Sequence, residues 1–179
     1  MDAVATLLAK DEIRELVLLY SRGVDRKDVA LLRDLYTADA TDTHGDSYDG
    51  PAGGYCDFLE RALPHMRMSA HNVCNHMISV AGDEAEGEVY AIAWHLIPDG
   101  QGGLRHDVLL VRYIDRYRRE GDGRWRFAKR VVTYDARIAL PADDHGPMPD
   151  ASGDPSHGEL TSRLFARGAR GGGSRAAAG

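Results

Sequence analysis

The sequence predicts an α+β domain in which three N-terminal helices pack on a strongly curved, mainly antiparallel sheet to form a cone-shaped barrel. Two observations predict it. Up to Pro64, apolar residues recur at the spacing of amphipathic helices, whereas long runs of β-strand texture follow one another after it. Glycine-containing turn sequences separate these later runs, which favours antiparallel pairing of neighbours. A long sheet of this kind twists and curls around its helices, and we expect the enclosed space to be a pocket.

Length and charge narrow the classes of function. The chain has 179 residues and a formal net charge of −6, with its Lys and Arg residues scattered among acids. Nucleic acid and anionic membrane surfaces both attract a concentrated basic patch, so we expect neither as a partner. Cys56 and Cys74 form no CxxC pair and follow no secretory segment, so we expect free thiols in a reducing cytoplasm. No apolar run approaches the length of a membrane span.

The C-terminal part differs in composition from the rest of the chain. We assign residues 1–140 to the folded domain and residues 141–179 to an irregular extension that cannot supply a core. Within this extension, ELTSRLFAR is expected to form a short helix that docks on a neighbour. Disorder is expected from about residue 168 onward.

The first two helices are predicted from apolar spacing and from their end signals. The first helix covers residues 4–20, and Gly23 is a plausible stop. Asp25 follows and precedes a second, short helix whose apolar positions fall between residues 29 and 36. On spacing alone, Asp25 is best interpreted as the N-cap of this second helix, with Asp28 completing a capping-box-like pair.

The remaining elements follow from strand texture and turn chemistry. Residues 40–44 are strand-like, and SYDGPAGG is expected to be a turn. Pro51 suits the first turn of a third helix, which Pro64 ends. The four later strands are predicted at about 69–80, 86–98, 105–119 and 124–135, with turns at Gly82-Asp83, Pro98-Asp99-Gly100 and Gly121-Asp122-Gly123.

Two histidines fall on the first of the long strands. Strict alternation puts His71 on one face with Val73, Asn75 and Met77, and His76 on the opposite face with Asn72, Cys74 and Ile78. His71 then faces the concave side and His76 faces away from it. Because the two imidazoles point to opposite sides, we expect no metal site between them.

The next strand presents a small, open face. Val89, Ala91, Ala93 and His95 share one side of it, and the alanines leave room for a ligand beside the histidine. A satisfied core histidine is the competing interpretation. The opposite side carries Tyr90, Ile92, Trp94 and Leu96, and such an apolar outer face favours assembly into a homo-oligomer.

Other polar residues are weaker candidates. Tyr20 lies on the inward stripe of the first helix, where a core role is the simplest interpretation. His44 follows Asp42 in the first strand, and Asp42 is the one acid that could face inward from a strand. Arg130 lies in RWRFAKR, where a surface arginine is unremarkable.

The order and spacing of several stretches resemble the SnoaL-like branch of the nuclear-transport-factor-2-like superfamily. They are IRELVLLYSRGVDRKDVALLRDLYTADA, DGPAG, SAHNVCNHMISV and DRYRREGDGRWRFAKRVV, within residues 5–138. The pattern is most similar to the cofactor-free lyases of that superfamily: hexachlorocyclohexane dehydrochlorinase, scytalone dehydratase and bile-acid 7α-dehydratase. The resemblance implies a cone-shaped fold, no cofactor and no metal.

The resemblance also implies site residues. Asp25 and His71 fall on the positions of an Asp–His dyad, and Tyr20 falls on a pocket tyrosine of the bile-acid enzyme. His95 falls on the second histidine of scytalone dehydratase, and His44 stands where that enzyme has a pocket tyrosine. A further member of the implied site is Arg130, which roughly matches a pocket arginine. Scytalone dehydratase has a tyrosine just before its Asp, whereas this chain has Val24, which weakens transfer of its substrate.

These residues permit a cofactor-free elimination. His71 is the expected base and Asp25 its orienting carboxylate, while Tyr20 or His95 donates a hydrogen bond to the leaving oxygen. We expect Ala91, Ala93, Val73, His44 and Arg130 to contact a small hydrophobic cyclic substrate that is steroid-, phenol- or polyketide-like.

Two alternatives stay open. One is a polyketide cyclase or ketosteroid-isomerase-like enzyme, and the other is a non-catalytic ligand-binding or accessory subunit. The resemblance implies a trimer or a dimer without choosing between them.

Overall fold

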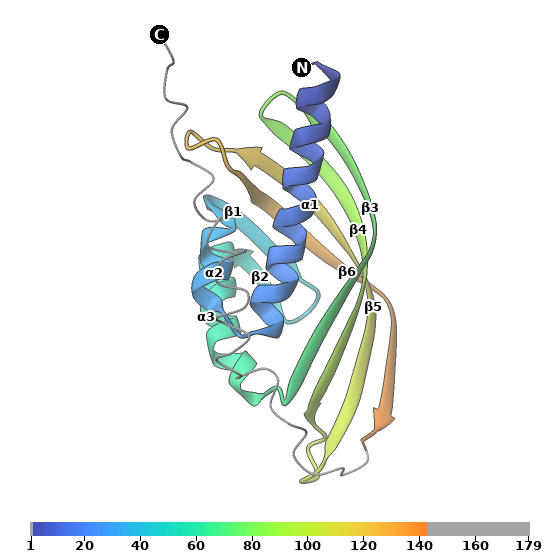
Figure 1. Cartoon of the computed structure of the whole chain (residues 1–179). Coiled ribbons are helices and arrows are strands. Elements are labelled where there is room, and N and C mark those ends of the chain that lie inside the picture. The colour runs from blue at the N-terminus through green and yellow to red at the C-terminus, as the bar shows by residue number, and fades with distance from the viewer. Residues whose placement is uncertain (1, 143–179) are drawn as a thin grey trace, which may run out of the picture.

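The computed structural model describes residues 2–142, so the predictions for the C-terminal extension, including its short helix, lie outside the described residues. Helices and two short strands make up the N-terminal part, and four long strands follow (Figure 1). The elements are α1 (Ala3–Asp25), α2 (Val29–Asp34), β1 (Tyr36–His44), β2 (Tyr48–Pro51), α3 (Ala52–Ala62), the 3-10 helix η1 (Leu63–His65), β3 (Met68–Ala81), β4 (Glu84–Pro98), β5 (Leu104–Arg119) and β6 (Trp125–Pro141).

The strands form one six-stranded sheet in the order β2-β1-β6-β5-β4-β3. All neighbours pair antiparallel except β1 and β6, which run parallel. The sheet curves strongly without closing, since β2 and β3 are its two edges, and the helices lie on its concave side (Figure 1). The predicted α+β cone is therefore confirmed. None of the helices among residues 2–142 is long and apolar enough to span a membrane.

α1 begins at an aspartate cap and ends at the site. Asp2 Oδ1 accepts a hydrogen bond from the Ala5 backbone N at 2.8 Å, which satisfies one of the free amides of the first turn. The helix continues through the predicted stop at Gly23, where a Cβ would lie only 2.6 Å from Cδ2 of Leu32. Glycine is used there for close packing of α1 against α2, and the helix ends two residues later, at Asp25.

The chain leaves α1 through a residue in the left-handed conformation. Lys27 has φ 58°, and the Asp28 backbone N donates to the Gly23 carbonyl at 2.8 Å, as in helix C-caps. Asp28, and not Asp25, is the N-cap of α2, since its Oδ1 accepts from the Leu31 backbone N at 3.0 Å. The predicted capping role of Asp25 is therefore wrong, and its carboxylate is available for other contacts.

Two further predictions around the first strands are wrong. Tyr36 opens β1 instead of ending the second helix, because α2 stops at Asp34. SYDGPAGG is not a turn throughout: Tyr48–Pro51 forms β2 and α3 begins at Ala52. Short strand segments rich in Gly, Asp and Pro lack the sequence signature of strands, and pairing with β1 decides their conformation.

A bulge in β3 overturns the predicted facing of its second half. The pairing with β4 shifts register between Val73 and His76, so the alternation of side chains reverses there. His76 consequently points to the same side as His71, whereas Met77 is exposed on the outer face. Gly87 makes room for this arrangement, since a Cβ there would lie 3.2 Å from His76 Nε2 and 2.8 Å from the Met77 carbonyl oxygen.

A buried ion pair sits in the core of the concave side. The guanidinium of Arg130 is fully buried and makes two hydrogen bonds to Asp115, from Nε at 2.8 Å and from Nη2 at 2.7 Å. Its carbon Cζ lies 4.1–4.3 Å from the ring centres of Tyr20, Tyr113 and Phe127. The aromatic rings and the carboxylate together offset the cost of removing this charge from water.

We predict that Asp115→Ala lowers the free energy of unfolding by about 3–5 kcal/mol, because it leaves the buried guanidinium without its counter-charge. Urea denaturation followed by circular dichroism measures this loss. The control is Asp135→Ala, which removes a half-exposed partner of Arg112 and should cost less than about 1 kcal/mol. Equal losses for the two variants would contradict the role of the buried pair.

Candidate acid–base site

Asp25 and His71 meet where the end of α1 approaches the start of β3. Oδ1 of Asp25 lies 2.7 Å from Nδ1 of His71, and Oδ2 accepts from the His71 backbone N at 2.9 Å. Ser69 Oγ donates to Oδ1 at 3.0 Å. The side chains are 23% and 7% exposed for Asp25 and His71, respectively, so both are largely shielded from water. One carboxylate thus holds both the imidazole and the strand that carries it.

The local fold fixes this carboxylate as an anion. Burial by itself would raise the pKa of Asp25, but the hydrogen bonds and the charge at His71, together with Ser69, outweigh it and lower the pKa. Lys27 adds a second link between the same elements, since its Nζ donates to the Met66 carbonyl at 2.9 Å just before β3 begins. An ionised Asp25 accepts the Nδ1–H of His71, which leaves Nε2 as the basic nitrogen of the neutral ring.

His95 lies next to His71 on the same concave face. The two ring centres are 5.4 Å apart, and β3 and β4 pair so that His71 is directly opposite Ala93 and Ser69 is opposite His95. Burial, and then the neighbouring charge at His71, lower the pKa of His95 to about 4. At neutral pH His95 is therefore an uncharged ring that can donate or accept a hydrogen bond.

Small side chains surround the two rings. Ala91 and Ala93 are buried on the inward side of β4, and Val73 is half-buried against the core. The outward side of β4 exposes Tyr90, Ile92 and Trp94, so the predicted division of this strand into two faces is confirmed. The inward positions of β4 next to the two histidines are therefore small and apolar.

Tyr20 and Arg130 do not join the Asp25–His71 pair. The Tyr20 hydroxyl is hydrogen-bonded to the Tyr55 hydroxyl at 2.9 Å, and its ring lies against the guanidinium of Arg130. Burial raises the pKa of Tyr20 far above its ordinary value. Arg130 is bonded to Asp115, so it is neither the surface arginine that its sequence context indicates nor a contact of His71.

His44 makes no hydrogen bond to His71 within the described residues, and it has its own carboxylate. Its Nδ1 is 3.2 Å from Oδ1 of Asp42, which is fully buried. Three members of this group, Asp42, Tyr36 and Tyr55, were not predicted as site residues. The alternation of Asp42 and His44 is the signal that could have found the acid, whereas nothing near Tyr36 or Tyr55 in the sequence indicates their hydroxyl contacts.

No group of three or more His, Cys, Asp or Glu side chains among residues 2–142 could hold a metal ion. The predicted reason, that His71 and His76 face opposite sides, is nevertheless wrong because of the β3 bulge. His76 instead lies with its Nε2 3.2 Å from the Tyr117 hydroxyl, which donates to Asp115. Within the described residues Cys56 is a buried free thiol and Cys74 an exposed one.

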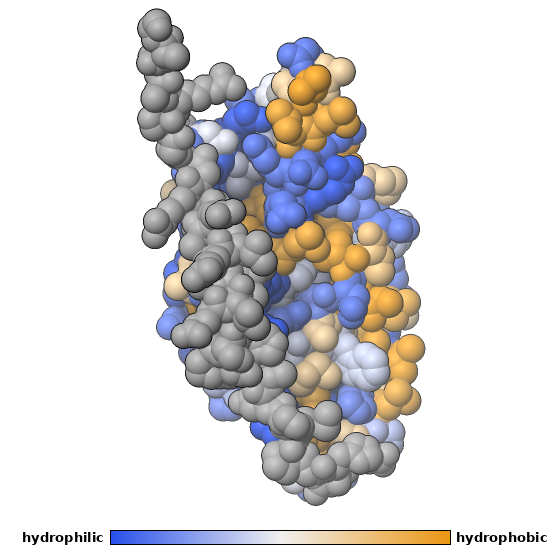
Figure 2. Space-filling view, in the orientation of Figure 1, coloured by the Kyte–Doolittle hydropathy of each residue, from blue (hydrophilic) through white to orange (hydrophobic). Residues whose placement is uncertain are grey.

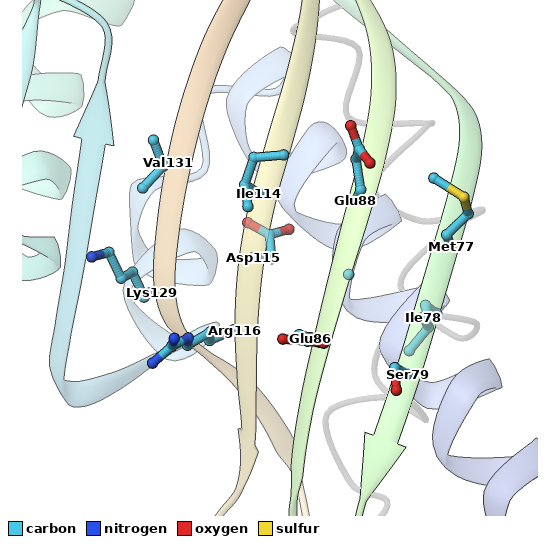
Figure 3. A pocket seen from close by; sticks show the side chains of 11 residues that line it. Met77, Ile78, Ser79, Glu86, Glu88, Ile114, Asp115, Arg116, Lys129 and Val131 are labelled. Atoms are coloured by element: carbon cyan, nitrogen blue, oxygen red, sulfur yellow. The ribbon is translucent and has the colours of Figure 1, made fainter.

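A hollow of about 650 Å³ lies on the outer face of the sheet, away from the helices (Figure 3). It is broad, and both acidic and basic side chains line it, including Glu86, Glu88, Arg116 and Lys129. None of the predicted site residues lines this hollow. It is therefore separate from the acid–base residues on the concave side.

Comparison with known proteins identifies the family and the fold. Residues 5–131 match the family described as the SnoaL-like domain. Hexachlorocyclohexane dehydrochlorinase type 3 from Novosphingobium barchaimii is 19% identical, covering 82% of this chain and all of that chain, with a TM-score of 0.72. A candidate scytalone dehydratase from Novosphingobium aromaticivorans is 20% identical, covering 84% of this chain and 99% of that chain, with a TM-score of 0.69.

A third similar structure is a protein of unknown function from Mycobacterium tuberculosis. It is 17% identical, covering 92% of this chain and 96% of that chain, with a TM-score of 0.61. At these identities the three structures show a shared fold. None of the curated proteins compared with the chain matches it.

We predict that stability falls as pH is lowered from about 6.5 to about 4, and that His95→Gln removes part of this fall. In this window the unfolded chain protonates His95 while the folded protein keeps it neutral, because burial lowers its pKa from 6.5 to about 4. The contribution of this shift is at most about 3 kcal/mol. His76, whose pKa burial also lowers to about 4, supplies a further part in the same window.

Urea denaturation at a series of pH values measures this dependence. The matched control is His65→Gln, which changes an exposed histidine and should leave the wild-type pH dependence in place. An unchanged dependence in His95→Gln would show that His95 is protonated as readily in the folded protein as in the unfolded chain.

Proposed function

The chain belongs to the SnoaL-like domain family, and from that premise we propose that it is a cofactor-free lyase of the dehydratase type. Its substrate would be a small hydrophobic cyclic compound, such as a hydroxy-steroid, a hydroxy-ketone or a polyketide-like phenol. One observation carries the proposal: the 2.7 Å contact between Asp25 Oδ1 and His71 Nδ1 on the shielded concave side of the sheet. A hexachlorocyclohexane dehydrochlorinase, which by its name catalyses an elimination, has the same fold, and this supports the proposal.

His71 is the base in this mechanism. Its Nδ1–H is directed to Asp25, and the ring's hydrogen-bond contacts within residues 2–142, to Asp25 and Ser69, are both made at Nδ1, so Nε2 is the nitrogen that takes a proton from carbon. Asp25 fixes the tautomer and stabilises the imidazolium that forms. General base assistance of this kind is worth about 10²–10⁴ in rate. Ser69 and the His71 backbone hold Asp25 in place while the charge moves.

The remaining residues bind and orient the substrate. His95 is an uncharged imidazole 5.4 Å from His71, so it would donate a hydrogen bond to a substrate oxygen without carrying a charge. Ala91, Ala93 and Val73 would contact the apolar ring system. Tyr20 and Arg130 are buried against one another, and we assign them to the wall of the pocket.

The carboxylates disfavour the cyclase- or isomerase-like alternative. Such an enzyme uses a free carboxylate as its base. Here Asp25 and Asp42 are each bound to a histidine, and the buried acids Asp107 and Asp115 are each bound to an arginine. A protein that only binds its ligand needs no ordered Asp–His contact. Turnover itself is the measurement that separates a lyase from a binding protein.

We predict that wild-type protein converts one or more hydroxylated cyclic compounds to a conjugated product, detected by its new ultraviolet absorbance. Asp25→Asn and His71→Gln should each lower kcat by about 100-fold or more, because each removes the general base or its orientation. Circular dichroism confirms that the variants fold.

The matched control for these variants is His65→Gln, an exposed histidine, which should keep the wild-type rate. Near-normal rates in both site variants would reject the lyase proposal. Stabilisation of the wild-type protein by the same compounds in thermal unfolding, with no turnover of any, would identify a binding protein instead.

We also propose that the outer face of the sheet is covered by another copy of the chain in a trimer or a dimer. Apolar side chains gather on this face, and each is more than a third exposed. Hydrophobic surface is visible along the outer side of the sheet and at the start of α1 (Figure 2). The outward apolar residues of β4 to β6 are Tyr90, Ile92, Trp94, Leu110, Ile138 and Leu140.

We predict that Trp94→Glu converts the assembled protein to monomers, because it buries a charge in the proposed contact. Light scattering coupled to size exclusion measures the mass. The control is Leu18→Glu, which places the same charge at a similarly exposed apolar position on α1 and should leave the mass unchanged. A monomeric wild-type protein would reject the proposed assembly.

A further inference from the structure

A second chain of hydrogen bonds runs through the interior, separate from Asp25 and His71. Tyr36 donates its hydroxyl to Asp42 Oδ2 at 2.7 Å, and Asp42 Oδ1 lies 3.2 Å from His44 Nδ1. The Nε2 of His44 is 3.4 Å from the Tyr55 hydroxyl, which contacts the Tyr20 hydroxyl at 2.9 Å. β1, α3 and α1 each contribute to this chain, and the His44 ring is stacked on Tyr55 with ring centres 4.8 Å apart.

The burial of Asp42 requires a positive partner. Its carboxylate is fully buried, and an isolated charge in the interior is strongly disfavoured. The one fully buried cation among residues 2–142 is Arg130, and two of its nitrogens are bonded to the equally buried Asp115. Asp115 therefore engages the one buried guanidinium, and Asp42 makes no described hydrogen bond to it. His44 is the side chain in contact with Asp42 that can carry the second positive charge.

His44 faces the same concave side as the Asp25–His71 pair. It pairs with Val132 of β6, and Val132 pairs with Tyr113 of β5, both buried on the inward face. Its side chain is 21% exposed, more than His71, so it is not sealed in the core.

We propose that Asp42 and His44 form a second acid–base centre in this site, in which His44 is an imidazolium that donates the proton for the leaving group. This inference rests on the proposed lyase function. His71 Nε2 takes the proton from carbon, and the C–H electron pair forms the new C=C bond. The C–O bond breaks, and the leaving oxygen takes the Nε2 proton of His44 and departs as water. One proton leaves the substrate and one arrives, so the protein's net charge is unchanged.

The other candidates for this acid are poorly suited. His95 is uncharged at neutral pH, since burial lowers its pKa to about 4. Tyr20 and Tyr55 are buried phenols, and burial raises the pKa of each well above the ordinary value, which makes both reluctant to release a proton. An imidazolium beside an ionised carboxylate combines a positive charge with a proton that it can give up near neutral pH.

Several charged or titratable groups surround His44. Asp42 lies on its own strand and Asp46 in the following turn, and the Tyr55 hydroxyl of α3 lies 3.4 Å from its Nε2. From β6, Arg130 pairs with Asp42 across the strands, and Tyr134 lies against Gly45 beside His44. Arg130 is bonded to Asp115, so Asp42 is the acid in direct contact with the imidazole.

The first test needs no substrate. In full-length protein labelled with ¹⁵N-histidine, the His44 signals are assigned by their loss in His44→Gln. We expect both ring nitrogens of His44 to carry protons at pH 7, and Asp42→Asn to lower the titration midpoint of this ring by about 1–3 pH units. Circular dichroism checks that Asp42→Asn folds. A neutral His44 ring in wild-type protein at pH 7 would overturn the inference without bearing on His71.

The second test uses a hydroxylated compound that the wild-type protein converts. We expect His44→Gln to lower kcat by about 10²–10⁴-fold and to remove the loss of rate at alkaline pH that reports a required acid. His65→Gln is the matched control. If His71→Gln loses activity while His44→Gln keeps a wild-type rate and pH profile, this inference fails alone. If His71→Gln also keeps its rate, the proposed lyase function has failed first.

Discussion

The contact between Asp25, the last residue of α1, and the first residues of β3 determines how the rest of the site is arranged. A carboxylate at the C-terminal end of a helix is opposed by the helix dipole, so Asp25 is badly placed by local rules. Hydrogen bonds from the His71 ring, the His71 backbone and Ser69 offset that cost. Because β3 is an edge strand, the same bonds fasten the edge of the sheet to the helix. Local rules are broken most often at sites selected for function.

Much of the fold could be predicted because it depends on periodicity, whereas the failures trace to contacts made across the fold. The inward stripe of α1 and the two faces of β4 follow from side-chain spacing alone. The bulge after Val73 does not, because it arises from pairing with β4 and reverses the facing of His76. From spacing, Asp25 is interpreted as a cap because Asp28, three residues later, completes a capping-box-like pair with it. The left-handed backbone at Lys27 separates the two positions, so that Asp25 ends α1 and Asp28 caps α2.

Buried charge is the part of the interior that sequence patterns describe least well. Arg130 stands among surface-like basic residues, and Asp115 in a run of alternating charges, yet they meet in the core between β5 and β6. Their partner strands shift register on both sides of this contact, so no fixed spacing in the sequence relates them. The contact of Asp42 with His44 is different, since two residues on one strand point to the same side. It could be anticipated once the limits of β1 were known.

Three inward histidines have the same side chain, but their different surroundings suit them to different roles. His71 has an ionised carboxylate at Nδ1 and an unengaged Nε2, which suits a base. His95 is held neutral by burial, which suits a hydrogen-bond donor. His44 is joined to an acid that is fully buried, and the proposed acid role rests on this contact. Burial and hydrogen-bond partners therefore give three side chains of one type different chemical properties. In the proposed lyase, the choice of substrate would depend on the small side chains of β4, not on the fold itself.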